Sequence, residues 1–87
     1  MVDTAKFTAL ANDPVCARIL NALRGGRALT APELARATGV TPQIARDHLT
    51  RIIETGLLGI LKHRRRDYYR LASPKAVQMV ESVMPDT

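Results

Sequence analysis

The sequence predicts one mainly α-helical domain with a small β-hairpin before its last helix. Apolar residues recur at helical spacing through most of the first 55 positions. After Gly56 the pattern changes to a short apolar run, and the β-prone segment Tyr68-Tyr69-Arg70-Leu71 follows a polar stretch, as expected for two strands. A chain of 87 residues has room for one core, so we expect a single domain over residues 1–87.

Two helices are expected in the first part of the chain. The first covers about residues 4–12, and Asp13-Pro14 ends it and begins the second, because proline fits the first turn of a helix. The second helix runs to about Arg24. Cys16 lies on its apolar stripe, so we expect this thiol to pack in the core rather than to bind a metal or take part in redox chemistry.

Two closely spaced helices are expected over about residues 30–55. Thr30 and Glu33 match a capping box, in which each side chain binds a free backbone N–H at a helix start. Gly39 ends this short helix, and Thr41-Pro42 begins the next one after only two or three residues. The spacing predicts a helix-turn-helix, whose second helix can lie in the major groove of DNA.

The second of these helices, about Pro42 to Thr55, has one polar face. At 100° per residue, five side chains project together away from the core: Gln43, Arg46, Asp47, Thr50 and Glu54. We expect Asp47 to pair with Arg51 four residues later, although a contact with cytosine is an alternative. His48 lies at the edge of the apolar face, so packing or orienting is expected of it rather than base contact.

The hairpin is expected over about residues 58–71 with a basic tip. Such a hairpin beside a helix-turn-helix forms a wing, from which guanidinium groups can reach phosphates or the minor groove. The candidates for these contacts, including one arginine on the preceding helix, are Arg51, Lys62, Arg64, Arg65, Arg66 and Arg70. Strand alternation predicts that Tyr69 faces the core and Tyr68 faces outward.

Composition favours a binding module with a polyanionic partner. Thirteen Lys and Arg against eight Asp and Glu give a net charge of +5, and the excess is greatest over residues 41–71. A core of this size leaves no room for an enclosed active site, so we expect no enzyme activity. One cysteine cannot form an internal disulfide, and no apolar run reaches the ~20 residues of a membrane span, so a cytoplasmic protein is expected.

Two segments carry a family resemblance that covers nearly the whole chain. DPVCARILNALRGGRALTAPELARATGVTPQIARDHLTRIIETGLL and KHRRRDYYRLASP resemble the ArsR/SmtB family of winged helix-turn-helix repressors. The resemblance implies that the helix from Pro42 to Thr55 reads bases through Gln43, Arg46 and Thr50, which the polar face also indicates. Family wings often have a glycine near the tip, and none stands here, so the turn type is left open.

The resemblance also implies a homodimer formed through the first and last helices, about residues 4–12 and 74–84. The last helix is apolar on more than one face, which independently favours a partner. The candidate interface residues are Phe7, Leu10, Val77, Val80, Val83 and Met84. The expected partners are therefore a second copy of the chain and double-stranded DNA carrying a palindromic operator.

No metal or other cofactor is expected, although many relatives sense metals. The family's Cys-x-Cys-Asp-Leu segment corresponds here to Thr30-Ala31-Pro32-Glu33-Leu34, which lacks both cysteines. In residues 73–84 the expected hard ligand is Glu81 alone, whereas zinc requires three or four converging donors. The resemblance is thus to a member that does not sense metals, and its inducer is unidentified.

Two alternative functions stay open. A winged helix can serve as an adaptor that binds protein or RNA, or it can be the N-terminal DNA-binding domain of a longer, ligand-sensing regulator. A polar helix face aligned with a triple-arginine wing favours DNA over an adaptor function.

Overall fold

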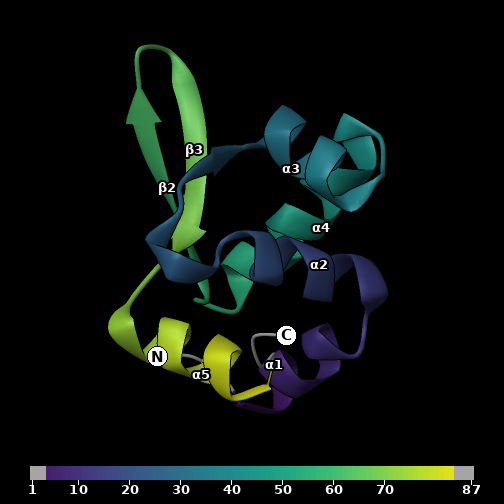
Figure 1. The fold of residues 1–87 in the computed structure, drawn as a ribbon, viewed down its shortest axis with the longest axis vertical. Coiled ribbons are helices and arrows are strands. Elements are labelled where there is room, and N and C mark those ends of the chain that lie inside the picture. Colours follow the sequence, from purple (N-terminus) through teal and green to yellow (C-terminus); the bar gives the residue numbers. More distant parts are fainter. Residues whose placement is uncertain (1–3, 84–87) are drawn as a thin grey trace.

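A computed structural model describes residues 4–83 of the chain. It contains helices, one short 3-10 turn and three strands, arranged as in Figure 1. In chain order these elements are α1 (Thr4–Ala11), α2 (Pro14–Ala22), the 3-10 turn η1 (Arg24–Gly26), β1 (Leu29–Thr30), α3 (Ala31–Thr38), α4 (Pro42–Glu54), β2 (Leu58–His63), β3 (Arg66–Leu71) and α5 (Pro74–Val83). The predicted winged helix-turn-helix is confirmed in its element order.

One strand was missed by the sequence analysis. The sheet has three antiparallel strands in the order β1-β3-β2, so β3 lies between the hairpin partner and the short β1. In β1, Leu29 pairs with Tyr69 and Thr30 pairs with Tyr68. A strand of two residues is too short to show alternation, and its pairing depends on a segment far along the chain.

The helix-turn-helix is fixed by caps at both of its helices. Thr30 and Glu33 form the predicted capping box: the Thr30 N–H donates to Glu33 Oε1 at 2.8 Å, and the Glu33 N–H donates to Thr30 Oγ1 at 3.3 Å. The hydrogen bonds that Glu33 Oε1 accepts from the Thr30 N–H and from Thr30 Oγ1, the latter at 3.0 Å, hold the pKa of the Glu33 carboxyl below its usual value. Gly39 ends α3 with φ +75°, and Thr41 caps α4 by accepting from the Ile44 N–H at 3.2 Å.

The core joins all five helices to the base of the sheet. Its buried side chains come from α1 to α5 and from the ends of the hairpin strands, and its largest members include Ile19, Leu20, Leu34, Leu49, Ile52, Leu57 and Val80. Cys16 is fully buried within it, which confirms the expected packing role. Tyr69 packs against the core as predicted, whereas the ring of the half-buried Tyr68 lies 6.4 Å from that of His63.

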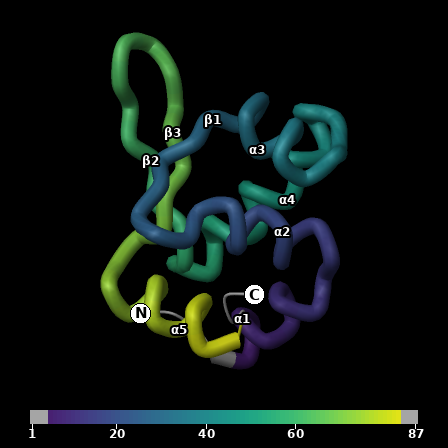
Figure 2. Tube along the Cα trace, in the orientation of Figure 1, coloured from purple at the N-terminus to yellow at the C-terminus, as the bar shows by residue number. Residues whose placement is uncertain are grey.

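Helices α1 and α5 lie at the end of the molecule opposite the tip of the hairpin (Figure 2). Two expected interface residues there belong to the core of the chain itself: Phe7 is 3 % exposed and Val80 is fully buried. They close the core beneath α1 and α5, so they offer almost no surface to a second chain, and the expectation is corrected for both. Leu10 and Val77 are half-buried, Val83 is 50 % exposed, and Met84 lies outside the described residues. Within residues 4–83 no helix is long and apolar enough to cross a bilayer.

Candidate nucleic-acid interface

The polar face of α4 is exposed along its whole length. Its apolar face buries Ala45, Leu49 and Ile52 in the core, so the opposite side of the helix must face solvent. The side chains on that side, Gln43, Arg46, Asp47, Thr50 and Glu54, are all exposed. The predicted polar ridge is therefore available to a partner.

Asp47 pairs with Gln43 and not with Arg51, which corrects the expected ion pair. The Gln43 Nε2 amide donates to Asp47 Oδ1 at 3.0 Å across one turn of the helix. An amide group has two N–H donors and one carbonyl acceptor. One N–H and Oε1 of Gln43 thus stay available, and these are the groups that bind the edge of adenine.

Thr50 also has its hydroxyl proton engaged within α4. Its Oγ1 donates to the Arg46 carbonyl oxygen at 3.0 Å, one turn earlier. The hydroxyl oxygen can still accept a hydrogen bond, and the methyl group can contact the methyl group of thymine. Arg46 itself keeps an exposed guanidinium group at the centre of the ridge.

A basic groove connects α4 to the wing. It is bordered by the start of α3, by α4 and by the hairpin, and its basic side chains are Arg36, Arg46, Lys62, Arg65 and Arg66. Glu33 and Asp67 are the acidic side chains of the same groove, and Glu33 is held in the capping box. The groove therefore brings one predicted base-contact residue together with three predicted phosphate-contact residues.

Arg36 was not identified by the sequence analysis. It is exposed in the last turn of α3 and lines the groove beside Arg46. The signal was its place on the polar side of the first helix of the helix-turn-helix, three residues after Glu33. In the helix-turn-helix geometry the first helix crosses the phosphate backbone, so a cation there suits a phosphate contact.

The tip of the wing is a two-residue turn. His63 pairs with Arg66, which leaves Arg64 and Arg65 as the two central residues, with φ of +50° and +69°. Two consecutive positive φ values define a type I′ turn, which resolves the turn type. Asparagine and glycine are favoured there, so two arginines are unusual. Both side chains are exposed, and Arg65 also lines the groove.

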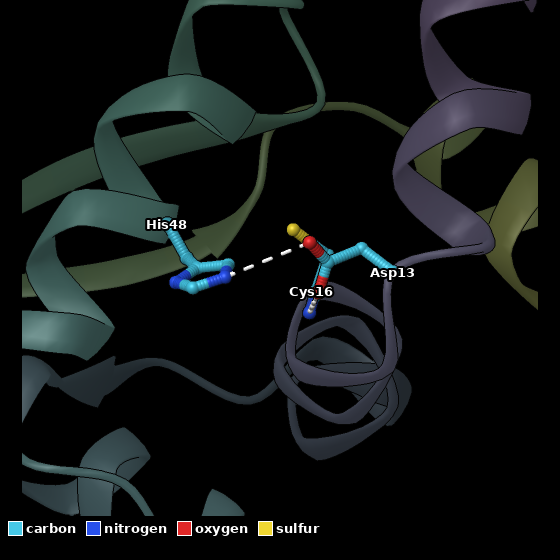
Figure 3. A group of neighbouring side chains, drawn as sticks. All are labelled: Asp13, Cys16 and His48. Atoms are coloured by element: carbon cyan, nitrogen blue, oxygen red, sulfur yellow. Dashed lines mark hydrogen bonds and ion pairs between the residues drawn. The ribbon is translucent and has the colours of Figure 1, made fainter.

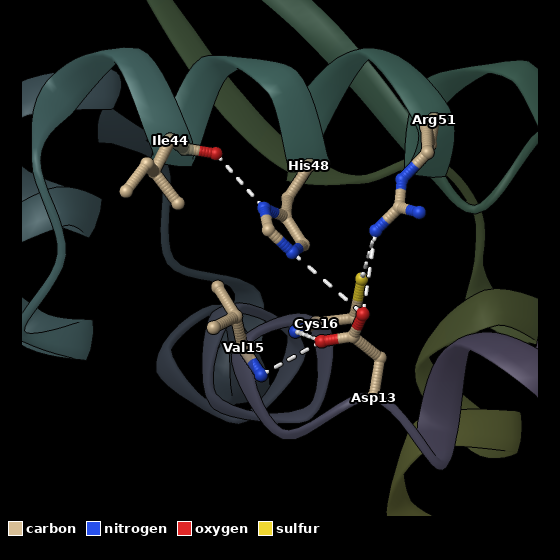
Figure 4. A network of polar contacts seen from close by, with 6 residues as sticks. All are labelled: Asp13, Val15, Cys16, Ile44, His48 and Arg51. Atoms are coloured by element: carbon tan, nitrogen blue, oxygen red, sulfur yellow. Dashed lines mark hydrogen bonds and ion pairs between the residues drawn. The ribbon is translucent and has the colours of Figure 1, made fainter.

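Two of the remaining cationic candidates lie elsewhere. Arg70 is exposed on β3, where it pairs with Gly59 near the base of the hairpin. Arg51 reaches back to the start of α2, where its Nη2 lies 3.3 Å from Asp13 Oδ2 (Figure 4).

His48 extends toward the same Asp13 carboxylate, with Nε2 at 3.7 Å, while its Nδ1 lies 2.9 Å from the Ile44 carbonyl oxygen. His48 therefore orients α4 against α2, in agreement with its predicted role.

Asp13 anchors this network because it also caps α2. Its Oδ1 accepts hydrogen bonds from the N–H groups of Val15 at 2.9 Å and Cys16 at 3.2 Å. Burial raises the pKa of the Asp13 carboxyl, but the two backbone hydrogen bonds and the neighbouring His48 and Arg51 outweigh it, so the pKa lies below 3.8.

The short α3, the glycine turn, the exposed polar α4 and the basic hairpin define a winged helix-turn-helix domain. The chain belongs to the helix-turn-helix domain family, whose model matches residues 10–58. Its winged-helix fold is shared by solved structures of transcriptional regulators.

Proteins of known sequence or structure agree with this assignment. The chain is 39 % identical over 80 residues to YdfF of Bacillus subtilis, an uncharacterized HTH-type transcriptional regulator; the match covers 92 % of this chain but 35 % of YdfF. It superimposes with a TM-score of 0.82 on Mb0332 from Mycobacterium bovis, at 24 % identity over 91 % of this chain and 72 % of that one. That structure is described as a homodimeric winged helix-turn-helix DNA-binding domain of a possible ArsR-family regulator. HlyU from Vibrio cholerae gives a TM-score of 0.81 at 20 % identity, over 91 % and 85 % of the two chains.

Proposed function

We propose that the chain is a sequence-specific DNA-binding transcriptional regulator that acts as a homodimeric repressor on a palindromic operator. The observation that carries this proposal is the basic groove, because it places Arg46 of α4 beside Lys62, Arg65 and Arg66 of the wing. A major groove about 12 Å wide admits one helix, and a hairpin next to that helix then meets the flanking backbone. In a bacterium such a protein works in the cytoplasm, where the chromosome lies.

Base reading is assigned to α4. Arg46 can donate two hydrogen bonds to guanine O6 and N7, Gln43 retains the groups that bind adenine, and Thr50 can accept a hydrogen bond or contact thymine. The Asp47 carboxylate keeps its negative charge, and the hydrogen bond from Gln43 holds it beside that side chain. The ridge therefore combines a strong guanine reader with weaker contacts on both sides.

Phosphate binding is assigned to the groove and the wing. Lys62, Arg65 and Arg66 line the groove, Arg64 extends from the tip, and Arg36 adds a cation from α3. Arg70 and Arg51 keep a supporting role, and Arg51 must leave Asp13 before it can reach a phosphate. Each phosphate neutralised by these residues releases counterions, so affinity should fall steeply with salt.

The dimer is assigned to the end formed by α1 and α5. Val83 is 50 % exposed there, and Leu10 and Val77 are half-buried beside the core. The structure of Mb0332, which this chain resembles in fold, is described as homodimeric. A two-fold dimer with recognition helices about 34 Å apart would contact successive major grooves, which requires a palindromic operator.

The proposal is tested by selecting duplexes from a random-sequence DNA library and measuring their affinity by fluorescence anisotropy at several salt concentrations. We expect the selected site to be palindromic and to bind more tightly than a scrambled duplex. Arg46→Ala should lose about 1–3 kcal/mol of the discrimination against a changed guanine. Arg27→Ala, which removes the same charge at a position away from the groove, is the matched control and should keep the preference.

The adaptor alternative makes the opposite prediction. If the protein binds protein or RNA instead, the selection should yield no consensus, and the wild type, Arg46→Ala and Arg27→Ala should bind every duplex equally weakly. That result would overturn the assignment of α4 as the DNA-reading helix.

A further inference from the structure

Three metal-binding residue types converge between α2 and α4, away from the basic groove (Figure 3). Asp13 precedes α2, Cys16 lies in its first turn, and His48 reaches across from the middle of α4. One donor atom from each lies within 4.8 Å of the other two. The sequence analysis missed this group because His48 is far from the other two residues along the chain.

Hydrogen bonds determine which atom of His48 and which atom of Asp13 can bind a metal ion. Nδ1 of His48 lies 2.9 Å from the Ile44 carbonyl oxygen, which can only accept, so Nδ1 carries the proton. In the neutral ring Nε2 then presents its lone pair to Asp13 Oδ2 at 3.7 Å. Asp13 Oδ1 is held by the Val15 and Cys16 N–H groups, which leaves Oδ2 for the cluster. Outer contacts of this kind, with a backbone carbonyl on the far ring nitrogen, typically orient histidine and carboxylate ligands of metals.

Cys16 adds a soft donor that is protected from solvent. The residue is fully buried, and its sulfur contacts the Arg51 guanidinium at a long 3.9 Å. A metal ion binds the thiolate, so the thiol proton leaves when the ion enters. One sulfur, one imidazole nitrogen and one carboxylate oxygen suit zinc or cadmium better than calcium or magnesium, which prefer oxygen alone.

We propose that Asp13, Cys16 and His48 form a binding site for a divalent cation of zinc-like chemistry, with a fourth position open to water. Bond lengths of about 2.0–2.3 Å around a tetrahedral ion require donor separations of roughly 3.3–3.6 Å. The Nε2–Oδ2 pair at 3.7 Å is already close to this range, and the sulfur, within 4.8 Å of both atoms, needs an approach of at most about 1.2–1.5 Å. The site joins α2 to α4.

Arg51 competes with the metal ion for this position. Its guanidinium group contacts both Asp13 Oδ2 and the Cys16 sulfur, so its positive charge lies against two of the three donors. The side chain is 56 % exposed and can move into solvent when the ion binds. Arg51→Ala should therefore strengthen metal binding by about two- to fivefold, which corresponds to the free energy that an exposed ion pair contributes.

The test is a titration of the 87-residue chain with Cd²⁺, followed by the ultraviolet charge-transfer absorption of the cadmium–thiolate bond. We expect one ion per chain and competition by Zn²⁺. Cys16→Ser should abolish the absorption band, and His48→Asn and Asp13→Asn should each weaken binding at least tenfold. His63→Ala, which removes the exposed histidine of β2, is the matched control and should bind as the wild type does.

The variants separate a metal site from a purely structural network. Asparagine is also a good helix N-cap, so Asp13→Asn retains the start of α2 and carries the test if Cys16→Ser does not fold. Absence of the band in the wild type, or equal affinity in the wild type, His48→Asn and Asp13→Asn, would overturn the proposal. A drop in affinity on Arg51→Ala would also contradict it. The measurement uses no DNA, so its outcome is independent of the function proposed above.

Discussion

Arg51 of α4 and Asp13 at the start of α2 are joined at 3.3 Å, so the proposed DNA-reading helix is held to α2 by charge as well as by apolar packing. His48 approaches the same carboxylate from one turn earlier in α4. Asp13 thus connects the cap of α2 to two side chains of α4, and its ionisation affects both.

Asp13→Asn should make the stability of the domain less dependent on acid pH. The folded pKa of Asp13 is lowered, so its contribution is fully present above about pH 3.8, its ordinary value, and is lost as the pH falls through the lower folded pKa. Asparagine keeps the cap but not the charge, so at pH 7 the free energy of unfolding should decrease by about 1 kcal/mol or less. Urea denaturation at pH 7 and at increasingly acid pH measures the difference, which should shrink as the pH falls below about 3.8. Glu54→Gln is the control for loss of one charge; an equal effect there would contradict the assignment.

Thr30→Ala should destabilise the domain by about 1 kcal/mol, because the N-cap of α3 loses its hydroxyl acceptor. Glu33→Gln should cost less, since glutamine can complete the capping box. Thermal or urea unfolding checks both values. Ser82→Ala, which removes a hydroxyl group bonded to a carbonyl within α5, should change stability by no more than about 0.5 kcal/mol. If Thr30→Ala matches that control, the cap does not stabilise the fold.

Removing two groove cations should flatten the salt dependence of DNA binding. Lys62→Ala with Arg66→Ala eliminates up to four phosphate contacts in a dimer, so the log–log slope should become shallower by about 3 to 4 units. The matched variant Arg24→Ala with Arg27→Ala removes the same charge from a different face. Anisotropy titrations at increasing salt compare the two double variants. Identical slopes would show that the wing does not contact DNA phosphates.

Arg65→Gly should change stability and DNA affinity in opposite directions. Arg65 has φ +69° in the wing turn, a conformation that costs a non-glycine residue about 1–2 kcal/mol, so glycine should stabilise the hairpin by roughly 1 kcal/mol. The lost cation should weaken DNA binding. Arg65→Ala is the control, because it removes the charge but keeps the positive φ; it should weaken binding without raising the midpoint of thermal unfolding. A stability gain in both variants would show that charge repulsion at the tip, not backbone strain, is relieved.

Val83→Glu should shift the protein from dimer to monomer. Val83 is the exposed apolar residue of α5 and lies at the proposed two-fold interface, where a buried carboxylate would be unpaired. Sedimentation velocity measures the mass of the particle. Ile60→Glu places the same charge on a residue of the wing with nearly equal exposure, 48 % against 50 %, and should leave the dimer intact. Equal dissociation in the two variants would point to a general effect of charge.

Local signals in the sequence accounted for most of the helices and for the exposed ridge. The Thr30–Glu33 capping box, the Gly39 turn and the Thr41-Pro42 start are fixed by contacts within four residues, so they could be predicted without tertiary structure. The ridge on α4 followed from helical periodicity alone. Local signals gave a wrong prediction where a neighbour in sequence competed with a distant residue. The predicted partner of Arg51 was Asp47, four residues earlier, but Arg51 pairs with Asp13.

The sequence by itself determined which residues are helical, which face of α4 is polar and where the basic charge lies, because these properties depend on spacing along one helix or hairpin. Only the tertiary structure decided which surfaces meet. It paired β1 with β3, buried Phe7 and Val80, added Arg36 to the groove and brought His48 to Asp13 and Cys16. Each of these contacts joins segments that are distant in sequence, and such contacts form only when the packing of the common core fixes the helices relative to one another.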